Sequence, residues 1–167
     1  DTLDFTNLTT TAGVNVTLTS FAFNSGGTAY TTTASGLENF TGGAQNDNFT
    51  GDGAANLLIG GAGADTLKGM AGADVIYGGI GDDSIDGGAA NDTLYGDAGN
   101  DLFTIDFSSV DTIDGGANTL KDTVKFNAGN TGTSIATDTN FVMNSTLTNI
   151  EKLDITGLTL NTANNNT

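Results

Sequence analysis

Large apolar residues recur at one phase of a nine-residue period between Gly42 and Thr104. The chain there divides into seven consecutive blocks of nine residues, without insertions, and glycine opens each block. The eighth position is always large and apolar: Phe49, Leu58, Leu67, Ile76, Ile85, Leu94 and Phe103. The sixth position is acidic in every block but one: Asp47, Asn56, Asp65, Asp74, Asp83, Asp92 and Asp101. A carboxylate that recurs at a fixed distance before a hydrophobic residue in successive blocks indicates a coiled, solenoid-like chain with cations bound between its turns.

Each block is expected to hold six loop residues followed by three strand residues. The glycines allow the positive φ values that a tight reversal needs. In the strand, position eight points to one face, and positions seven and nine point to the other. Successive strands must then lie on opposite walls of a flattened coil, and position eight fills the space between two parallel sheets. The sequence therefore predicts an all-β fold, a parallel β-roll (β-solenoid) with two nine-residue blocks, or eighteen residues, in each turn and β-strand caps at both ends.

Three regions follow along the chain. Residues 1–41 contain short alternating apolar stretches, which predict flanking strands and an N-terminal β cap. The repeats of the β-roll occupy 42–104, and residues 105–167 form a C-terminal β cap that ends in an Asn/Thr-rich linker. Strand-like runs in the flanks are 14–18, 21–23, 119–126, 141–143 and 150–155. The segments 37–40 and 150–153 resemble each other, and we interpret both as caps, because a repeat stack needs atypical ends.

The nine-residue period extends slightly beyond the regular blocks. Counted back from Gly42, residues 33–41 put Glu38 at position six and Phe40 at position eight, with Gly36 at position four, which indicates a degenerate half-turn. Downstream, the triplet that begins at Asp111 resumes the pattern one residue out of phase, and the triplet that begins at Asp122 repeats it after a longer loop.

Loops of alternate blocks are expected to stack on the same edge of the roll, with their sixth-position carboxylates roughly one strand spacing, ~4.8 Å, apart. A divalent cation between two such carboxylates converts their repulsion into coordination. The expected pairs are Asp47–Asp65, Asp65–Asp83, Asp83–Asp101, Asn56–Asp74 and Asp74–Asp92. Loop carbonyls add further oxygen ligands, from Gly43, Gly61, Gly63, Gly72, Gly79, Gly81, Gly88 and Gly99. An oxygen-only ligand set favours calcium over magnesium, and the pairs predict about five Ca²⁺ ions on which folding depends.

Composition narrows the class of function. The chain carries 20 acidic residues against four lysines, a net charge of −16, which disfavours nucleic acid and anionic membrane as partners. It has no cysteine and no histidine, so disulfides, zinc–thiolate sites and histidine-based catalysis are excluded, and we expect no enzyme. No apolar run is long enough to cross a bilayer, so we expect no membrane insertion. The start at Asp1 resembles a cut inside a longer protein.

The blocks GGAGADTLK and GGIGDDSID match GGXGXDXUX throughout, where U is a large apolar residue. The repeat region thereby resembles the RTX (repeat-in-toxin) calcium-binding β-roll family. The flanking segments DTLDFTNLT, GLENFTGG and LTNIEKLDITG resemble those that border RTX arrays in large bacterial surface proteins of the S-layer or adhesin type. The resemblance implies calcium in the loops, export by type I secretion, and a structural role on the extracellular cell surface. The alternative is an RTX secretion and folding module attached to an exported enzyme or toxin.

Two simpler interpretations stand beside these expectations. The sixth-position aspartates would also suit Asx turns that hold no metal. Glu38 and Glu151, the only glutamates, fit hydrogen bonding in the caps better than an acid/base pair, because nothing else in the chain assists them.

The two outer walls of the expected roll differ in polarity. One wall presents Leu57, Ile59, Val75 and Tyr77, whereas the opposite wall is mainly polar. An apolar surface of this kind predicts that a neighbouring domain of the same chain or an identical subunit covers it.

Overall fold

The structure is a computed structural model, and it describes residues 2–4, 15–17, 20–25, 28–32, 38–105, 109–116, 121–126, 146–150 and 152–154. These residues form strands joined by turns and loops, with no helix among them. The expected strand at 141–143, Gly36, Glu151 and the Asn/Thr-rich tail lie outside the described residues.

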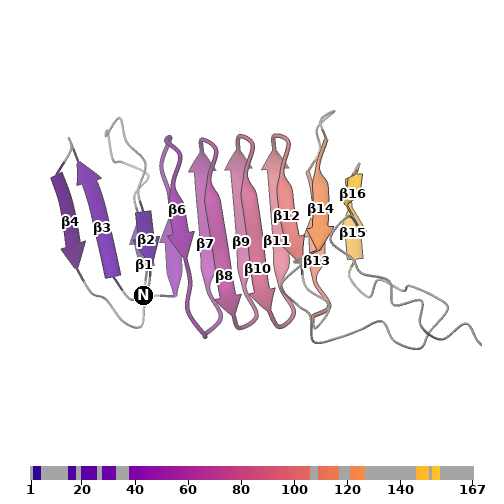
Figure 1. Ribbon diagram of the computed structural model, residues 1–167, viewed down its shortest axis with the longest axis horizontal. Coiled ribbons are helices and arrows are strands. Elements are labelled where there is room, and N and C mark those ends of the chain that lie inside the picture. Colours follow the sequence, from indigo (N-terminus) through magenta and orange to yellow (C-terminus); the bar gives the residue numbers. More distant parts are fainter. Residues whose placement is uncertain are drawn as a thin grey trace, which may run out of the picture.

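The strands stand side by side along the long axis of the molecule, in two sheets (Figure 1). The first sheet has seven strands, in the order β1 (Thr2–Asp4), β5 (Asn39–Thr41), β7 (Leu57–Ala62), β9 (Val75–Ile80), β11 (Thr93–Ala98), β13 (Thr112–Asp114) and β15 (Thr146–Thr148). All its neighbouring strands are parallel. We call it sheet A.

The second sheet, sheet B, has nine strands. Their order is β16 (Lys152–Asp154), β14 (Thr123–Phe126), β12 (Leu102–Ile105), β10 (Ser84–Ala89), β8 (Thr66–Ala71), β6 (Asn48–Thr50), β2 (Asn15–Thr17), β3 (Ser20–Ser25) and β4 (Thr28–Thr32). Its strands are parallel from β16 to β2, whereas β2, β3 and β4 pair antiparallel.

The register of the strands confirms the predicted winding. In sheet A, Leu57 pairs with Val75 and Val75 with Thr93; in sheet B, Thr66 pairs with Ser84. Paired residues are therefore 18 positions apart in the sequence. Asp65 and Asp83, which a hydrogen bond links, have the same separation. The chain alternates between the two sheets from one strand to the next. The all-β parallel β-roll expected from the sequence is therefore the observed fold.

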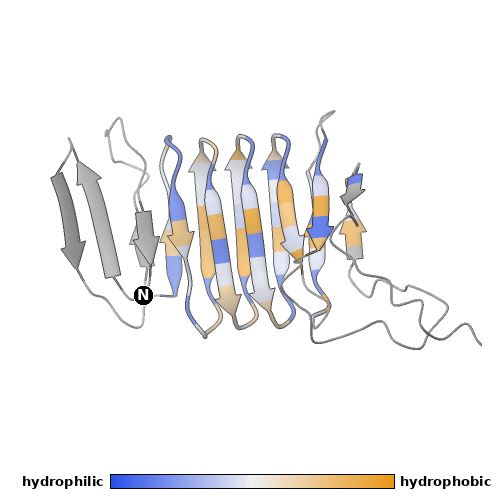
Figure 2. Cartoon of the chain, in the orientation of Figure 1, coloured by the Kyte–Doolittle hydropathy of each residue, from blue (hydrophilic) through white to orange (hydrophobic). Residues whose placement is uncertain are grey.

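The eighth-position side chains form the core between the sheets. All of them are fully buried: Phe49, Leu58, Leu67, Ile76, Ile85, Leu94 and Phe103. Figure 2 shows this as hydrophobic colour across the strands, with hydrophilic colour in several of the turns. Phe40, Ile113 and Val124 extend the same core beyond the regular blocks. Burial of one such side chain stabilises the fold by about 1.5–3 kcal/mol.

The strands of the central repeats are longer than predicted. β7 to β11 each contain six residues rather than three, because strand pairing continues through the first three positions of the next block. The physical reason lies in the glycines. Gly61 has no side chain where a Cβ would collide with the Gly43 carbonyl, so the backbones of adjacent turns stay close enough for Ala62 N–H to donate to that carbonyl at 2.8 Å. Only positions four to six then form the bend.

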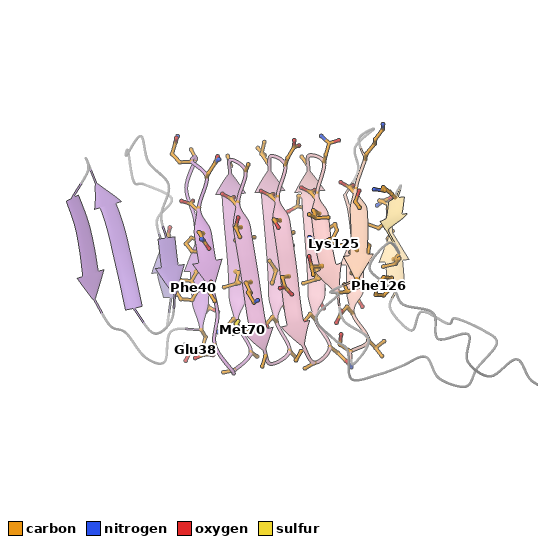
Figure 3. The ribbon with its side chains drawn as sticks, viewed as in Figure 1. Glu38, Phe40, Met70, Lys125 and Phe126 are labelled. Atoms are coloured by element: carbon orange, nitrogen blue, oxygen red, sulfur yellow. The ribbon has the colours of Figure 1, made fainter. Side chains whose placement is uncertain are left out.

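Both ends of the roll continue its stacking with less regular residues. At the N-terminal end, Phe40 of β5 is buried in line with Leu58, as the degenerate half-turn predicted. At the C-terminal end, the register step rises to 19 residues between β11 and β13 and to 21 residues between β12 and β14. Figure 3 places Glu38 and Phe40 near one end of the repeats and Lys125 and Phe126 near the other.

Candidate metal centre

The sixth-position side chains are buried in two columns, one along each edge of the roll. They are polar, and yet each is at most 4% exposed: Asp47, Asn56, Asp65, Asp74, Asp83, Asp92 and Asp101. Each precedes a strand by one residue, so the register of the strands stacks residues of alternate blocks on the same edge. The fold therefore brings together each pair that the sequence predicted.

A ladder of hydrogen bonds runs through each column. The N–H of Asp65 donates to Oδ1 of Asp83 at 2.7 Å, and the N–H of Asp83 donates to Oδ1 of Asp101 at 2.9 Å. On the opposite edge, the N–H of Asp74 donates to Oδ1 of Asp92 at 2.9 Å. One carboxylate oxygen of each aspartate is thus held by the backbone of the preceding turn.

The second carboxylate oxygen has no such partner. Oδ2 of Asp65, Asp74, Asp83 and Asp101 is buried and accepts no hydrogen bond from any residue that the structure describes. A buried anionic oxygen without a donor is unfavourable by several kcal/mol unless it takes up a proton or binds a cation. A cation bound next to these four oxygen atoms would therefore stabilise the roll.

Backbone carbonyls gather next to these oxygens. A Cβ added to Gly60 would collide both with Oδ2 of Asp65 and with the carbonyl oxygen of Gly78, one turn further on. The same arrangement recurs at Gly78, beside Asp83. Glycine at the first position of each block thus leaves room for a carboxylate oxygen and a carbonyl oxygen on one side of its backbone.

The predicted glycine ligands also stack along the two edges. At the second position, the missing Cβ of Gly61 faces the Gly43 carbonyl, and that of Gly79 faces the Gly61 carbonyl. At the fourth position, Gly81 faces the Gly63 carbonyl, and Gly99 faces that of Gly81. On the other edge, Gly72 lies against Ala54, and Gly88 lies against Met70. Each edge therefore carries columns of stacked loop carbonyls, and the carbonyls that lie beside Oδ2 of Asp65 and Asp83 are those of the first-position glycines.

Burial shifts the pKa of these carboxyl groups upward. Desolvation raises the pKa of Asp65 and Asp74 to about 6, and that of Asp83 and Asp101 to about 7, against backbone hydrogen bonds that lower it. Neighbouring carboxylates of the same column add to the rise, for example Asp65 and Asp101 around Asp83. The column is thus poised to bind a cation or a proton near neutral pH.

Groups of three or more acidic side chains around one point are absent from the described residues. A cation in these loops would therefore take one or two carboxylates and draw its remaining ligands from backbone carbonyls. Such a donor set, all oxygen and on flexible backbone, suits calcium.

The first two loops of the array differ from the others. In loop 42–47, Oδ2 of Asp47 accepts a hydrogen bond from Gly43 N–H at 2.9 Å, and in loop 51–56, Oδ1 of Asn56 accepts one from Asp52 N–H at 3.0 Å. Each loop thus closes on its own sixth-position side chain through an N–H group four residues earlier in the chain. An Asx turn would take its donor from two residues after the side chain, so these bonds are of a different kind. Gln45 and Ala54, which replace the fourth-position glycine here, do not adopt positive φ.

Two residues of the ladder were missing from the predicted site. Asp111 and Asp122 are buried, and their Oδ1 atoms accept hydrogen bonds from the N–H groups of Asp92 at 3.1 Å and Asp101 at 2.8 Å. Both residues begin a triplet of the kind found in all but one of the regular blocks, in which an aspartate is followed by any residue and then by a large hydrophobe. The triplets are Asp111-Thr112-Ile113 and Asp122-Thr123-Val124, and they do not keep the nine-residue spacing.

Two other aspartates of the repeats lie at the surface, Asp82 in a loop and Asp86 in β10. Asp82 is exposed and accepts hydrogen bonds from Asn100, which lower its pKa. Asp86 lies on the outer face of sheet B and forms an ion pair with Lys68 at 3.3 Å. Neither belongs to the buried columns.

In a comparison with protein families, residues 32–67 and 68–103 match the RTX calcium-binding nonapeptide repeat. The repeat region belongs to the RTX family. The RTX match begins before Gly42, in agreement with the degenerate half-turn of β5, and ends before Asp111 and Asp122. RTX repeats bind calcium, so this region is a calcium-binding module. Comparison with curated proteins gave no match. Among the residues that the structure describes, we find no helix with the length and hydropathy of a membrane span.

Proposed function

We propose that this chain is a calcium-binding structural module of a secreted cell-surface protein, which folds when it binds Ca²⁺ outside the cell. The observation that carries the proposal is the set of buried Oδ2 atoms of Asp65, Asp74, Asp83 and Asp101 beside backbone carbonyls. Calcium, when bound, supplies the positive charge that these oxygens lack. Nothing in this chemistry requires catalysis, and we assign the module no enzymatic activity.

The residues that would hold the ions are the sixth-position aspartates and the loop glycines. The Asp65–Asp83 pair is the strongest candidate, since both loops carry glycine at positions one, two and four. Asn56 contributes no charge, and its Oδ1 already accepts a hydrogen bond from Asp52 N–H within loop 51–56, so the sites that involve Asn56 should be the weakest. About five ions are expected along the two edges.

Circular dichroism tests whether folding depends on the ion. In excess chelator we expect the β-sheet signal to be largely lost, and millimolar Ca²⁺ should restore it, because metal binding to these oxygen ligands is coupled to folding. Magnesium at the same concentration should restore less, since it requires a smaller and more regular octahedral ligand set. A complete β spectrum in chelator contradicts the proposal.

The location of the parent protein is the less direct part of the proposal. A rigid module set by calcium would suit an S-layer or an adhesin, and the absence of cysteine suits a chain that is exported before it folds. In a secretion and folding module of an enzyme or toxin, the same roll would follow a catalytic domain. The domain content of the full-length protein decides between the two: a catalytic domain supports the enzyme or toxin module, and further β-rich repeats support the surface role.

The outer face of sheet A is proposed to bind a neighbouring domain or an identical subunit. Leu57, Ile59, Val75 and Tyr77 are half-buried on this face, and the ring of Tyr77 stacks on that of Tyr95 with centroids 4.6 Å apart. Serine at Ile59 and Tyr77 should abolish the association of the parent protein or of its modules, measured by sedimentation. Unchanged sedimentation contradicts the assignment.

A further inference from the structure

The last repeat loop meets a carbonyl that does not belong to the repeats. Beside Gly96, Oδ2 of Asp101 lies near the carbonyl oxygen of Gly115, and a Cβ added to Gly96 would come within 2.9 Å of that carbonyl. Asp101 is 1% exposed, and its Oδ2 accepts no hydrogen bond from the described residues. An anionic oxygen and a carbonyl oxygen close together repel each other, so this arrangement calls for a cation between them.

The same arrangement holds between two regular repeats. Beside Gly78, the Oδ2 of Asp83 lies near the carbonyl of Gly96. Gly115 therefore takes the place of the first-position glycine of a further block. The RTX match ends at residue 103, and the step from Asp101 to Asp122 is 21 residues, whereas that from Asp83 to Asp101 is 18 residues. The nine-residue spacing of the sequence therefore does not predict that Gly115 occupies the first position of a block.

Asp122 supplies the carboxylate of that further block. It is fully buried, and its Oδ1 accepts a hydrogen bond from Asp101 N–H at 2.8 Å, the bond that links successive aspartates in the repeats. Its own carbonyl accepts a hydrogen bond from Lys152 N–H at 3.0 Å, at the start of β16. The missing Cβ of Gly115 faces Oδ2 of Asp122 and the carbonyl of Asn149. The C-terminal cap thus repeats the loop arrangement with non-repeat residues.

We propose that Asp101 and Asp122, with the carbonyl of Gly115, hold a further Ca²⁺ ion that fixes the C-terminal cap to the last repeat. The inference rests on the proposed function, since it assumes that the regular loops bind calcium. It adds a site outside the family match, and it makes the position of β14 and β16 dependent on calcium, although neither strand contains a repeat.

Native mass spectrometry in calcium acetate tests the site by counting ions. The Asp122→Asn variant should hold one Ca²⁺ fewer than the unaltered chain, because the amide keeps the shape and loses the charge. Asp86→Asn is the matched control: it removes the same charge from the outer face of sheet B and should leave the count unchanged. Equal counts for Asp122→Asn and the unaltered chain overturn the site. If the unaltered chain binds no calcium at all, the proposed function itself fails.

Hydrogen exchange in the unaltered chain gives a second measurement that does not depend on the variant folding. Over a calcium titration, the amides of β14 should gain protection in the same calcium-dependent step as those of β12. Protection of β14 that is already complete in chelator, or that does not change with calcium, overturns the proposal.

Discussion

The amide of Asp65 donates a 2.7 Å hydrogen bond to Oδ1 of Asp83, which lies one full turn further along the roll. The bond fixes the Asp83 carboxylate inside the stack and leaves its Oδ2 buried beside the backbone of Gly78. Backbone hydrogen bonding thus orients the side chain, and a different partner must neutralise it.

Asp83→Asn should raise the Ca²⁺ concentration at the folding midpoint roughly 10- to 100-fold, because it removes a charged oxygen that two neighbouring pairs share. The measurement is a calcium titration followed by circular dichroism. Asp82→Asn, at the exposed neighbouring position, should shift the midpoint little. A similar shift in both variants would mean that net charge, and not the buried column, sets the affinity.

Asn56→Asp should have opposite effects with and without calcium. The new carboxylate completes an acidic column on its edge, so it should lower the calcium midpoint and raise the ion count. In chelator it adds a buried charge near Asp74, so it should weaken any residual structure. Native mass spectrometry and thermal unfolding in both conditions measure the two effects. The same sign in both conditions contradicts this account of Asn56.

Acidification should stabilise the metal-free chain and weaken its binding of calcium. The pKa of Asp83 and Asp101 in the folded chain is about 7, above the ordinary value of 3.8, so their burial as anions destabilises the metal-free roll at higher pH. Protonation removes this cost as pH falls from about 7 towards 4. In chelator, the β-sheet signal in circular dichroism should therefore increase from pH 8 to pH 5, whereas the calcium midpoint should move to higher concentrations. A metal-free β-sheet signal that decreases on acidification contradicts the prediction.

Met70→Gly should stabilise the calcium-bound roll by about 0.5–1 kcal/mol. Met70 stands at the second position of its block with φ of 84°, which strains a residue that has a side chain, and it is 44% exposed, so little packing is lost (Figure 3). Urea unfolding in saturating calcium measures the change. Ala71→Gly, at the next residue, has no positive φ to relieve and should destabilise by a similar amount.

Ile85→Ala should destabilise the roll by about 2–5 kcal/mol, since it leaves a cavity between the two sheets. Ser84→Ala, the outward neighbour on the same strand, should change the free energy of unfolding by less than about 0.5 kcal/mol. Urea unfolding in saturating calcium compares the two variants. Equal effects of the two substitutions would contradict the placement of the eighth position in the core.

The nine-residue phase by itself determined the winding, the core and the partners within each column. Position eight had to point inward, and the two-block register followed from strands on alternate walls. The phase could not determine the length of the strands, because the sequence does not reveal that glycine backbones such as Gly61 and Gly43 approach closely enough to continue the ladder. The phase also predicts the same role for loops 42–47 and 60–65. The tertiary structure distinguishes them: Gly43 N–H donates to Oδ2 of Asp47 in the first loop, whereas in the second Oδ2 of Asp65 accepts no hydrogen bond from the part of the chain that the structure describes.

Asp111 and Asp122 show where the sequence pattern stops being informative and strand pairing becomes necessary. Their triplets are visible in the sequence, but insertions break the spacing, and a periodic pattern carries no weight once its phase is lost. Strand pairing restores the phase, because hydrogen bonds between β12 and β14 align Leu102 with Thr123 whatever the length of the loop between them. The sequence thus determined which residues are suited to hold a cation, and the stacking of the strands decided how far along the chain those residues come together.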